Sequence, residues 1–498
     1  MQSPCRTSVF SVPLWFPIFS LGLALLLALS ACGGGGGGGG ASGSGGLPQQ
    51  ASVRTLAFAV SQCREGADGF FAHQTLQIRR GDSASVNVGV GALTEMQDPP
   101  VLPGVCTIFG LSRWGFIAAF AGGIQRMAVS PDGSGVVFET TNRFSILQYP
   151  PLAPDSEGFF FVRADGRGLR PLGPASRESI TRFVFDGSPP YGFRTDYDQT
   201  PLSFSADGRT VVFTDRGPGP TGEDSTQVVT MDVATGARRQ ATQLPPATLP
   251  HDPLLLDIES VRFLPDGRIV FGTNFTNPDG LHPQGGVFTI KPDGTDLTAI
   301  PDPVALAGSH IDPRFEITGD EVTSFALALP GGTSQEIFLS DHGDLLELTN
   351  FGRGDTGRGT VDIDGQRVFF VASADPFKTN STENCQIFSI DRLGTDLRQL
   401  TDFSQGGHSA LGCFGSNGGP PPGCISREPR QDPATRAIVF SSSCDPVGMN
   451  QNGEQIFAMN PDGTGLQQLT DTSGFTTEAD GTVDVELPGP FASTAVRR

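Results

Sequence analysis

The sequence predicts an all-β fold for most of the chain, on two observations. The chain holds 66 Gly, 40 Pro and 37 Phe but only 17% charged residues, and it has no long helical period rich in Ala, Glu, Lys and Leu. Short runs rich in Val, Ile and Phe recur on either side of turn sequences such as Pro-Asp-Gly. This pattern is typical of half-buried strands joined by tight turns.

The strands belong to a repeat of two phrases, each of which reads as strand, turn, strand. The first phrase occurs as MAVSPDGSGVVFET from Met127, LSFSADGRTVVFTD from Leu202, VRFLPDGRIVFGTN from Val261, VDIDGQRVFFVAS from Val361 and SREPRQDPATRAIVFSSS from Ser426. The second phrase follows it as GFFFVRADGRGLRPLG from Gly158, GGVFTIKPDGTDLTAI from Gly285, EIFLSDHGDLLELTN from Glu336, QIFSIDRLGTDLRQLTD from Gln386 and QIFAMNPDGTGLQQLTD from Gln455. Proline fixes φ, aspartate bonds its own backbone, and glycine takes the positive φ that closes the turn.

Two phrases in series predict a four-stranded antiparallel sheet of roughly 45 to 70 residues, with strands a, b, c and d. Such a sheet cannot bury both faces alone, so the copies must stack around an axis as the blades of a β-propeller. Six near-complete copies lie between Gln125 and Asp471, including a divergent strand c at Gln227 to Asp232 and a short strand a at Arg314 to Ile317.

Incomplete copies stand at both ends of the repeat region. Arg54 to Cys63 matches strand b, and Gln74 to Val90 matches strands c and d, but no strand a precedes them. GTVDV, Gly481 to Val485, matches strand a and is followed by a proline and a short tail. We therefore expect seven blades, with the C-terminal strand completing the first blade. The alternative is six blades, with the segment from Arg54 to Val90 as a cap.

The N-terminal segment predicts export and lipid anchoring. An apolar run from Leu21 to Cys32 is too short to span a membrane with normal flanks and is typical of a signal peptide, residues 1–31. Leu29-Ser30-Ala31-Cys32 resembles a bacterial lipobox, which implies cleavage before Cys32 and lipidation of its sulfur. An ordinary signal peptide is the alternative. Eight glycines, Gly33 to Gly40, lie in a flexible tether over residues 32–50, ahead of a propeller over residues 51–498.

The net charge limits the kinds of partner that we expect, and the cysteine content predicts disulfides. The net charge of −20 opposes binding to nucleic acid and to anionic lipid, so any membrane contact is expected through the lipid anchor alone, and the chain is expected to be a monomer. Six cysteines follow the lipobox, an even number that suits disulfides in an exported chain: Cys63, Cys106, Cys385, Cys413, Cys424 and Cys444. Cys413 and Cys424 bracket a short loop and are the pair that the spacing favours.

Two groups of residues are candidate metal ligands. His251, His310 and His408 fall in predicted d to a connections near the central channel, where imidazoles, with Asp252 or Asp312, could hold a divalent metal such as Mn²⁺ or Ca²⁺. His73 and His282 are placed in b to c loops. The alternative is that long loops simply collect polar residues.

Two b to c loops share the pattern DPFKTN, Asp375 to Asn380, and DPVGMN, Asp445 to Asn450, the second extended by Asn452. Asp and Asn oxygens on such loops suit Ca²⁺, although the spacing is not that of an EF-hand. The alternative, which the sequence favours, is that these side chains cap turns by bonding the local backbone.

The phrases S-P-D-G-x-x-[IV]-x-F and I-F-x-x-x-x-D-G-x-x-L-x-x-L-T resemble the WD40-like repeats of the TolB propeller family over nearly all of the mature chain. TolB itself has an α/β domain ahead of its propeller, and only a tether stands here, which argues against TolB itself. The resemblance implies either a protein-binding scaffold or, more distantly, a propeller related to prolyl oligopeptidases and oligogalacturonate lyases. GGHSALG, Gly406 to Gly412, lacks the second glycine of a serine-hydrolase elbow, so serine hydrolysis is not expected.

The sequence thus favours a non-enzymatic, lipid-anchored propeller of the outer membrane, facing the periplasm or the exterior, that binds a protein, peptide or glycan of the envelope through its loops. The alternative is a metal-dependent enzyme acting on polysaccharide through His251, His310 and His408. No catalytic residue is assigned.

Overall fold

The computed structural model describes residues 50–493, with larger gaps at 99–122, 142–156, 178–201, 247–257, 301–314 and 404–423 and shorter gaps elsewhere. The chain divides into two compact units, Met1–Leu47 and Pro48–Arg498, and all described residues belong to the second. Their secondary structure consists of strands alone. Within these ranges no helix long and apolar enough to cross a membrane is present. The predicted signal peptide, lipidation site and tether lie outside the described residues.

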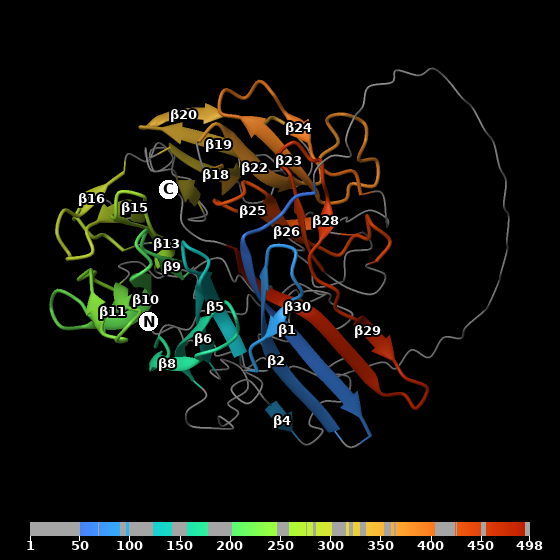
Figure 1. The fold of residues 1–498 in the computed structure, drawn as a ribbon. Coiled ribbons are helices and arrows are strands. Elements are labelled where there is room, and N and C mark those ends of the chain that lie inside the picture. The colour runs from blue at the N-terminus through green and yellow to red at the C-terminus, as the bar shows by residue number, and fades with distance from the viewer. Residues whose placement is uncertain are drawn as a thin grey trace, which may run out of the picture. The chain divides into compact units, whose positions relative to one another are not determined.

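The strands form seven antiparallel sheets, which confirms the expected seven-bladed propeller (Figure 1). Blade 2 is β5 (Gly123–Val129), β6 (Gly135–Thr141), β7 (Gly158–Arg163) and β8 (Arg170–Gly173); blade 3 is β9 (Ser203–Phe204), β10 (Thr210–Pro218), β11 (Asp224–Asp232) and β12 (Arg238–Gln240). Blade 4 is β13 (Ile258–Phe263), β14 (Ile269–Asn274), β15 (Gly285–Ile290) and β16 (Thr298–Ala299); blade 5 is β17 (Phe315–Ile317), β18 (Val322–Ala328), β19 (Gln335–Asp341) and β20 (Asp344–Glu347). Blade 6 is β21 (Thr360–Val361), β22 (Arg367–Ala372), β23 (Gln386–Asp391) and β24 (Arg398–Gln399); blade 7 is β25 (Ser426–Gln431), β26 (Ile438–Ser442), β27 (Gln455–Met459) and β28 (Gln467–Gln468).

Blade 1 is assembled from both ends of the described chain. β1 (Thr55–Gly66) pairs with β2 (Gly69–Arg80), which pairs with β3 (Val86–Asn87), and on its other side β1 pairs antiparallel with β30 (Val483–Ser493). The predicted closure by the C-terminal strand is therefore confirmed. The segment that would have capped a six-bladed ring is strands b, c and d of a true blade.

Blade 1 also differs from the expectation in length. The sequence predicted that strand a stops before Pro488, yet β30 runs on to Ser493, and Val60 pairs with Pro488. This is possible because a register shift between Phe58 and Val60 accommodates the prolines, and β30 beyond Glu486 is an edge strand, where a missing N–H is tolerated. β1 and β2 likewise run past the expected strand ends.

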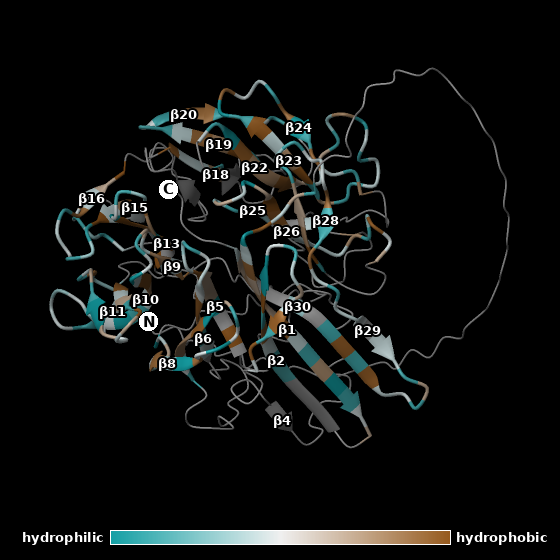
Figure 2. Ribbon diagram, viewed as in Figure 1, coloured by the Kyte–Doolittle hydropathy of each residue, from teal (hydrophilic) through white to brown (hydrophobic). Residues whose placement is uncertain are grey.

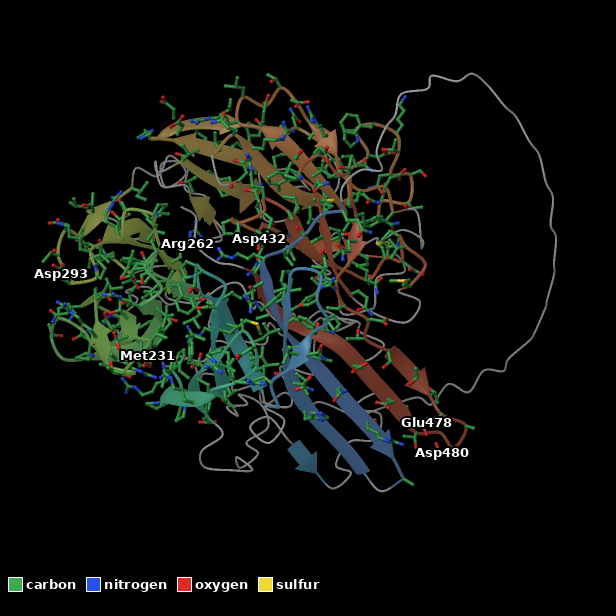
Figure 3. The ribbon with its side chains drawn as sticks, in the orientation of Figure 1. Met231, Arg262, Asp293, Asp432, Glu478 and Asp480 are labelled. Carbon is green, nitrogen blue, oxygen red and sulfur yellow. A yellow bond between two sulfur atoms is a disulfide. The ribbon has the colours of Figure 1, made fainter. Side chains whose placement is uncertain are left out.

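The extra length of blade 1 forms an arm. The far ends of β1, β2 and β30 are joined by β29 (Gly474–Thr477), which pairs with β30, and by β4 (Met96–Asp98), which pairs with β2. Figure 1 shows these strands extending away from the ring, and Figure 3 places Glu478 and Asp480 at the tip of the arm. His73 lies inside β2 opposite Gln62, so its predicted place in a loop is wrong.

Among the residues that the structure describes, an apolar cluster joins each pair of neighbouring blades and closes the ring. Each cluster draws buried side chains from two adjacent sheets, and the seventh packs Leu56, Phe58 and Val60 of blade 1 against Val439 and Ile456 of blade 7. Five blades place a Phe of strand b directly opposite a Phe of strand c, with ring centroids 5.5 to 6.0 Å apart: Phe138–Phe160, Phe271–Phe288, Phe325–Phe338, Phe370–Phe388 and Phe440–Phe457. Stacked pairs of this kind add to the stability that burial provides.

Turn glycines make the blades fit one another closely. In strand c to d turns, a Cβ on Gly236 of blade 3 would lie 1.9 Å from the carbonyl oxygen of Leu172 in blade 2, and one on Gly463 of blade 7 would lie 2.9 Å from that of Leu400 in blade 6. The glycines of the repeat therefore supply positive φ and also allow close approach of the preceding blade. Figure 2 shows hydrophobic colour along the strands that pack between blades and hydrophilic colour at many turns.

Candidate functional site

Among the described residues, four blades share a hydrogen-bonded arrangement at strand c, which we call the clasp. In blade 7, Gln455 at the start of strand c accepts hydrogen bonds from the Thr470 hydroxyl (2.7 Å) and the Thr472 N–H (3.1 Å), and the Thr470 hydroxyl accepts from the Ile456 N–H (2.8 Å). Three other blades repeat this arrangement with the pairs Gln227–Thr242, Glu336–Thr349 and Gln386–Thr401. In blades 5, 6 and 7 the clasp satisfies buried polar groups where strand c begins, next to the b to c loop, whereas in blade 3 Gln227 lies inside β11. It therefore gives these loops a fixed base.

The b to c loop of blade 6 is anchored to this clasp. The Asn380 side chain is buried and donates to the carbonyl oxygens of Ser373, Ala374 and Asn384 at 2.8 to 3.2 Å. Its own oxygen accepts from the N–H of Asn384 (3.1 Å) and from the side chain of the clasp residue Gln386 (3.3 Å). The Asp375 carboxylate accepts from the Asn380 N–H (2.7 Å). These contacts are those of turn caps.

The equivalent loop of blade 7 is held by a disulfide. Cys424, just before β25, bonds to Cys444, just after β26, so the bridge joins the start of strand a to the end of strand b beside Asp445. The expected pairing of Cys424 with Cys413 is therefore wrong: the cysteine that adjoins Cys424 in space lies at the end of the neighbouring strand. Cys63 and Cys385 are disulfide-bonded as well, and Cys106 and Cys413 lie outside the described residues.

We call Asp375–Asn380 of blade 6 and 445–449 of blade 7 the DP loops. Both are b to c connections of adjacent blades, and because antiparallel strands alternate in direction, both lie on the same face of the ring. Each presents large apolar side chains to solvent: Phe377 is 45% exposed, Val447 39% and Met449 59%. Exposed aromatic and Met side chains on a rigid base are characteristic of protein-binding surfaces.

A buried ion pair joins blades 2 and 3 and is not part of the DP loops. The Arg126 guanidinium contacts the Glu139 carboxylate at 2.7 Å, with both side chains 1% exposed, and also bonds the hydroxyl and carbonyl of Thr214 in blade 3. Glu139 accepts in turn from the Ser176 N–H at 2.6 Å. A buried pair with this many partners fixes how the two blades dock, and the sequence analysis did not foresee it.

Arg238 continues this joint toward solvent. Its guanidinium lies 2.9 Å from the Asp215 carboxylate and stacks over the rings of Phe159 and Phe213. Burial lowers the pKa of Arg238, and the attraction of Asp215 opposes that shift. Every contact described for Arg126, Glu139 and Arg238 goes to blade 2 or blade 3, which indicates a structural joint.

Most predicted metal ligands lie outside the described residues. This holds for His251, His310, His408, Asn450 and Asn452. Asp375 and Asn380 are described, and because the Asn380 oxygen already accepts from two N–H donors, it is committed to the loop. Within the described ranges, no three His, Cys, Asp or Glu side chains are grouped to hold a metal ion. The DP pattern was the signal in the sequence that marked these loops, and the turn caps that the sequence favoured over Ca²⁺ ligands are confirmed for Asn380.

Comparison with known proteins gives likeness of fold alone. No protein-family model matches the chain, and no curated protein is significantly similar to it. Among solved structures, the chain is similar to the β-propeller domain of the trilobed protease from Pyrococcus furiosus, with 8% identity, 85% of this chain and 99% of that chain covered, and a TM-score of 0.44. It is also similar to oligogalacturonate lyase from Vibrio parahaemolyticus (9% identity, 82% and 98% covered, TM-score 0.45) and to a protein assigned as TolB from Agrobacterium tumefaciens (12%, 88% and 99%, TM-score 0.30).

Proposed function

We propose that this protein is a non-enzymatic, lipid-anchored propeller, TolB-like in its repeats, that binds a protein or peptide of the bacterial cell envelope through the DP loops. The observation that carries the proposal is the exposure of Phe377, Val447 and Met449 on loops whose bases are held by a clasp and by a disulfide. Rigid loops lose little conformational entropy on binding, so exposed apolar side chains on them contribute most of their burial energy to affinity.

The aliphatic side chains favour a protein or peptide over a glycan. Val447 and Met449 have neither a flat ring for a sugar to stack on nor hydrogen-bonding groups for its hydroxyls. They do suit the apolar side chains of a polypeptide. The polysaccharide-active alternative depends on His251, His310 and His408, and no contact among the described residues favours it.

Site-specific photo-crosslinking tests the binding face. A photoreactive phenylalanine analogue placed at Phe377 or Met449 in living cells is expected to form a covalent adduct with one defined protein. Leu393 is the matched control, since it is 70% exposed but lies in the strand c to d turn of blade 6, on the opposite face. Equal adducts from Leu393, or none from Phe377 and Met449, would contradict the proposal.

The purified partner then allows affinity to be measured. Phe377→Ala and Met449→Ala are each expected to weaken binding by roughly 5- to 100-fold, the range for an anchor side chain at an interface, while Leu393→Ala leaves it unchanged. The anchor is tested separately by metabolic labelling with a fatty-acid analogue, which should label the chain and fail to label Cys32→Ser.

A further inference from the structure

The two DP loops differ at one position where the backbone is left-handed. In blade 7 this position is Gly448, with φ of 73°, and in blade 6 it is Lys378, with φ of 61°. Glycine adopts this conformation without a steric penalty, whereas a side chain with a Cβ is disfavoured there. A Cβ on Gly448 would meet nothing within 4 Å, so the cost of a lysine in this loop is one of backbone conformation alone. The loop shape is thus best served by glycine, and Lys378 occupies the position against that preference.

The ammonium group of Lys378 faces solvent on a very acidic protein. The chain has two lysines and a net charge of −20. Lys291 is bound to Asp296 in a strand c to d turn. Lys378 is exposed, and within the described part of the chain no carboxylate lies within ion-pair distance of its ammonium group.

Three features coincide at Phe377 and Lys378: a left-handed backbone at an exposed residue, an exposed ammonium group and an adjacent exposed ring. Non-glycine residues in left-handed conformations often lie at binding sites, where the strain positions a side chain for a ligand. A cation beside an apolar anchor recognises a ligand that carries a carboxylate next to an apolar group.

We propose that Lys378 determines the specificity of the DP loops and selects a partner segment in which an Asp, a Glu or a C-terminal carboxylate adjoins an apolar side chain. The apolar side chain packs on Phe377, with Val447 and Met449 of blade 7 on the same face, and the carboxylate pairs with Lys378. This inference rests on the proposed function. The net charge of −20 weakens non-specific attraction of such a segment to the protein as a whole.

Selection from a displayed library of short random peptides tests the inference with the full chain as bait. The wild-type chain is expected to enrich peptides with Asp, Glu or a free carboxylate beside an apolar residue. Lys378→Glu should instead enrich peptides with Lys or Arg beside the apolar residue. Its affinity for the peptides selected by the wild-type chain should fall more than about tenfold, and that of Lys378→Gly should fall about fivefold. Phe377→Ala should abolish binding of the peptides selected by the wild-type chain and, when combined with Lys378→Glu, of those selected by Lys378→Glu.

Other results would overturn the inference in distinguishable ways. Peptides that need Phe377 but bind Lys378→Glu unchanged would overturn the specificity and leave the proposed function intact. If no enriched peptide depends on Phe377, Val447 or Met449, both fail. Binding of polygalacturonate that depends on Lys378, with no peptide enriched, would show that an acidic glycan is the ligand and overturn both.

Stability separates a binding role for Lys378 from a structural one. Lys378→Gly is expected to raise the melting temperature by about one to two degrees while it weakens peptide binding, because it relieves the left-handed strain. Gly448→Lys is the matched control and should lower the melting temperature by a similar amount. A lower melting temperature for Lys378→Gly would indicate that the lysine supports the loop and would overturn the inference.

Discussion

Blade 7 and blade 1 are neighbours in the ring, yet they are built in opposite ways. Blade 7 comes from one continuous segment, β25 to β28, and its strand order follows the chain. Blade 1 places β30, from the C-terminal end, beside β1, from the N-terminal end. The strands of blade 7 are joined by local connections, a clasp and the Cys424–Cys444 disulfide, whereas blade 1 requires strands from opposite ends of the described chain to meet. The comparison therefore separates the interactions that stabilise a single blade from the β1–β30 pairing that closes the ring.

The largest expected effect comes from breaking blade 1. Deletion of residues 483–498 removes β30, exposes the edge of β1 and opens the apolar cluster that includes Phe491 and Leu56. A domain is stable by only about 5 to 15 kcal/mol, so the loss of the strand that closes the ring should leave no cooperative unfolding transition above room temperature. Circular dichroism during heating, with limited proteolysis, measures this.

Two controls accompany the deletion. Removal of residues 494–498 alone leaves β30 whole and should not change the melting temperature. A synthetic peptide of residues 483–493, added in excess, should restore protease resistance to the truncated chain. Cooperative melting of the truncated chain at the wild-type temperature would show that β30 does not close the ring.

Removal of the Cys424–Cys444 disulfide of blade 7 should have the next largest effect on stability. Replacement of Cys424 and Cys444 by serine removes a bridge across a sequence separation of 20 residues, which is expected to lower the free energy of unfolding by about 3 kcal/mol. Urea unfolding under non-reducing conditions gives the value. The ring itself should still close, so the double variant should keep a single cooperative transition, unlike the chain without β30.

Two glycines of nearly equal φ sharpen the comparison. Gly463 in blade 7 (φ 85°) packs against the Leu400 carbonyl of blade 6, whereas Gly481 in the arm of blade 1 (φ 87°) has no heavy atom within 4 Å of a built Cβ. Gly481→Ala should lower the free energy of unfolding by about 1 kcal/mol, because alanine is disfavoured in a left-handed backbone conformation. Alanine at Gly463 should cost about 1 to 2 kcal/mol more, because the blades must also separate. Equal losses would show that φ alone explains the repeat glycines.

Low pH should slightly reduce the stability of both blade 7 and blade 1. The Thr464 hydroxyl and N–H lower the pKa of Asp462 in blade 7, and the Thr482 N–H lowers that of Asp480 in blade 1, each from the usual 3.8. A carboxyl with a lower pKa when folded stabilises the fold at any pH above 3.8 and loses that contribution as the pH falls through its folded pKa. Asp462→Asn and Asp480→Asn should flatten the fall of melting temperature below about pH 4. An unchanged slope would refute this role.

The sequence predicted the strands and their closure well because both are encoded in repeated local signals. The match of GTVDV to internal copies of strand a correctly indicated a closing C-terminal strand, but Val483 to Val485 pair with the far end of β1, and the later residues of β30, up to Ser493, take the strand a position in the ring. The short β17 fell inside the predicted Arg314 to Ile317. The extension of β30 through Pro488 and Pro490 could not be predicted, because it depends on a register shift opposite β1 that local propensity does not encode.

The candidate site was less predictable because it depends on contacts between segments far apart in sequence. The DP pattern marked the loops of the candidate site, but whether Asn380 binds a metal or caps a turn is decided by Asn384 and Gln386 around it. Loop length favoured Cys413 as the partner of Cys424, whereas strand pairing brings Cys444 beside it. The left-handed backbone at Lys378 has no signal in the sequence apart from Gly448 at the equivalent position of the other DP loop.

The pairing of Leu56 with Ser493 makes the position of the chain break in the ring arbitrary. A short linker between the two ends of blade 1 would turn the propeller into a continuous circle, and cutting that circle in the β10 to β11 connection at Gly222, where nothing crowds the backbone, would give a circular permutant whose interlocked blade is blade 3. In such a permutant, both chain termini would emerge from blade 3 instead of blade 1.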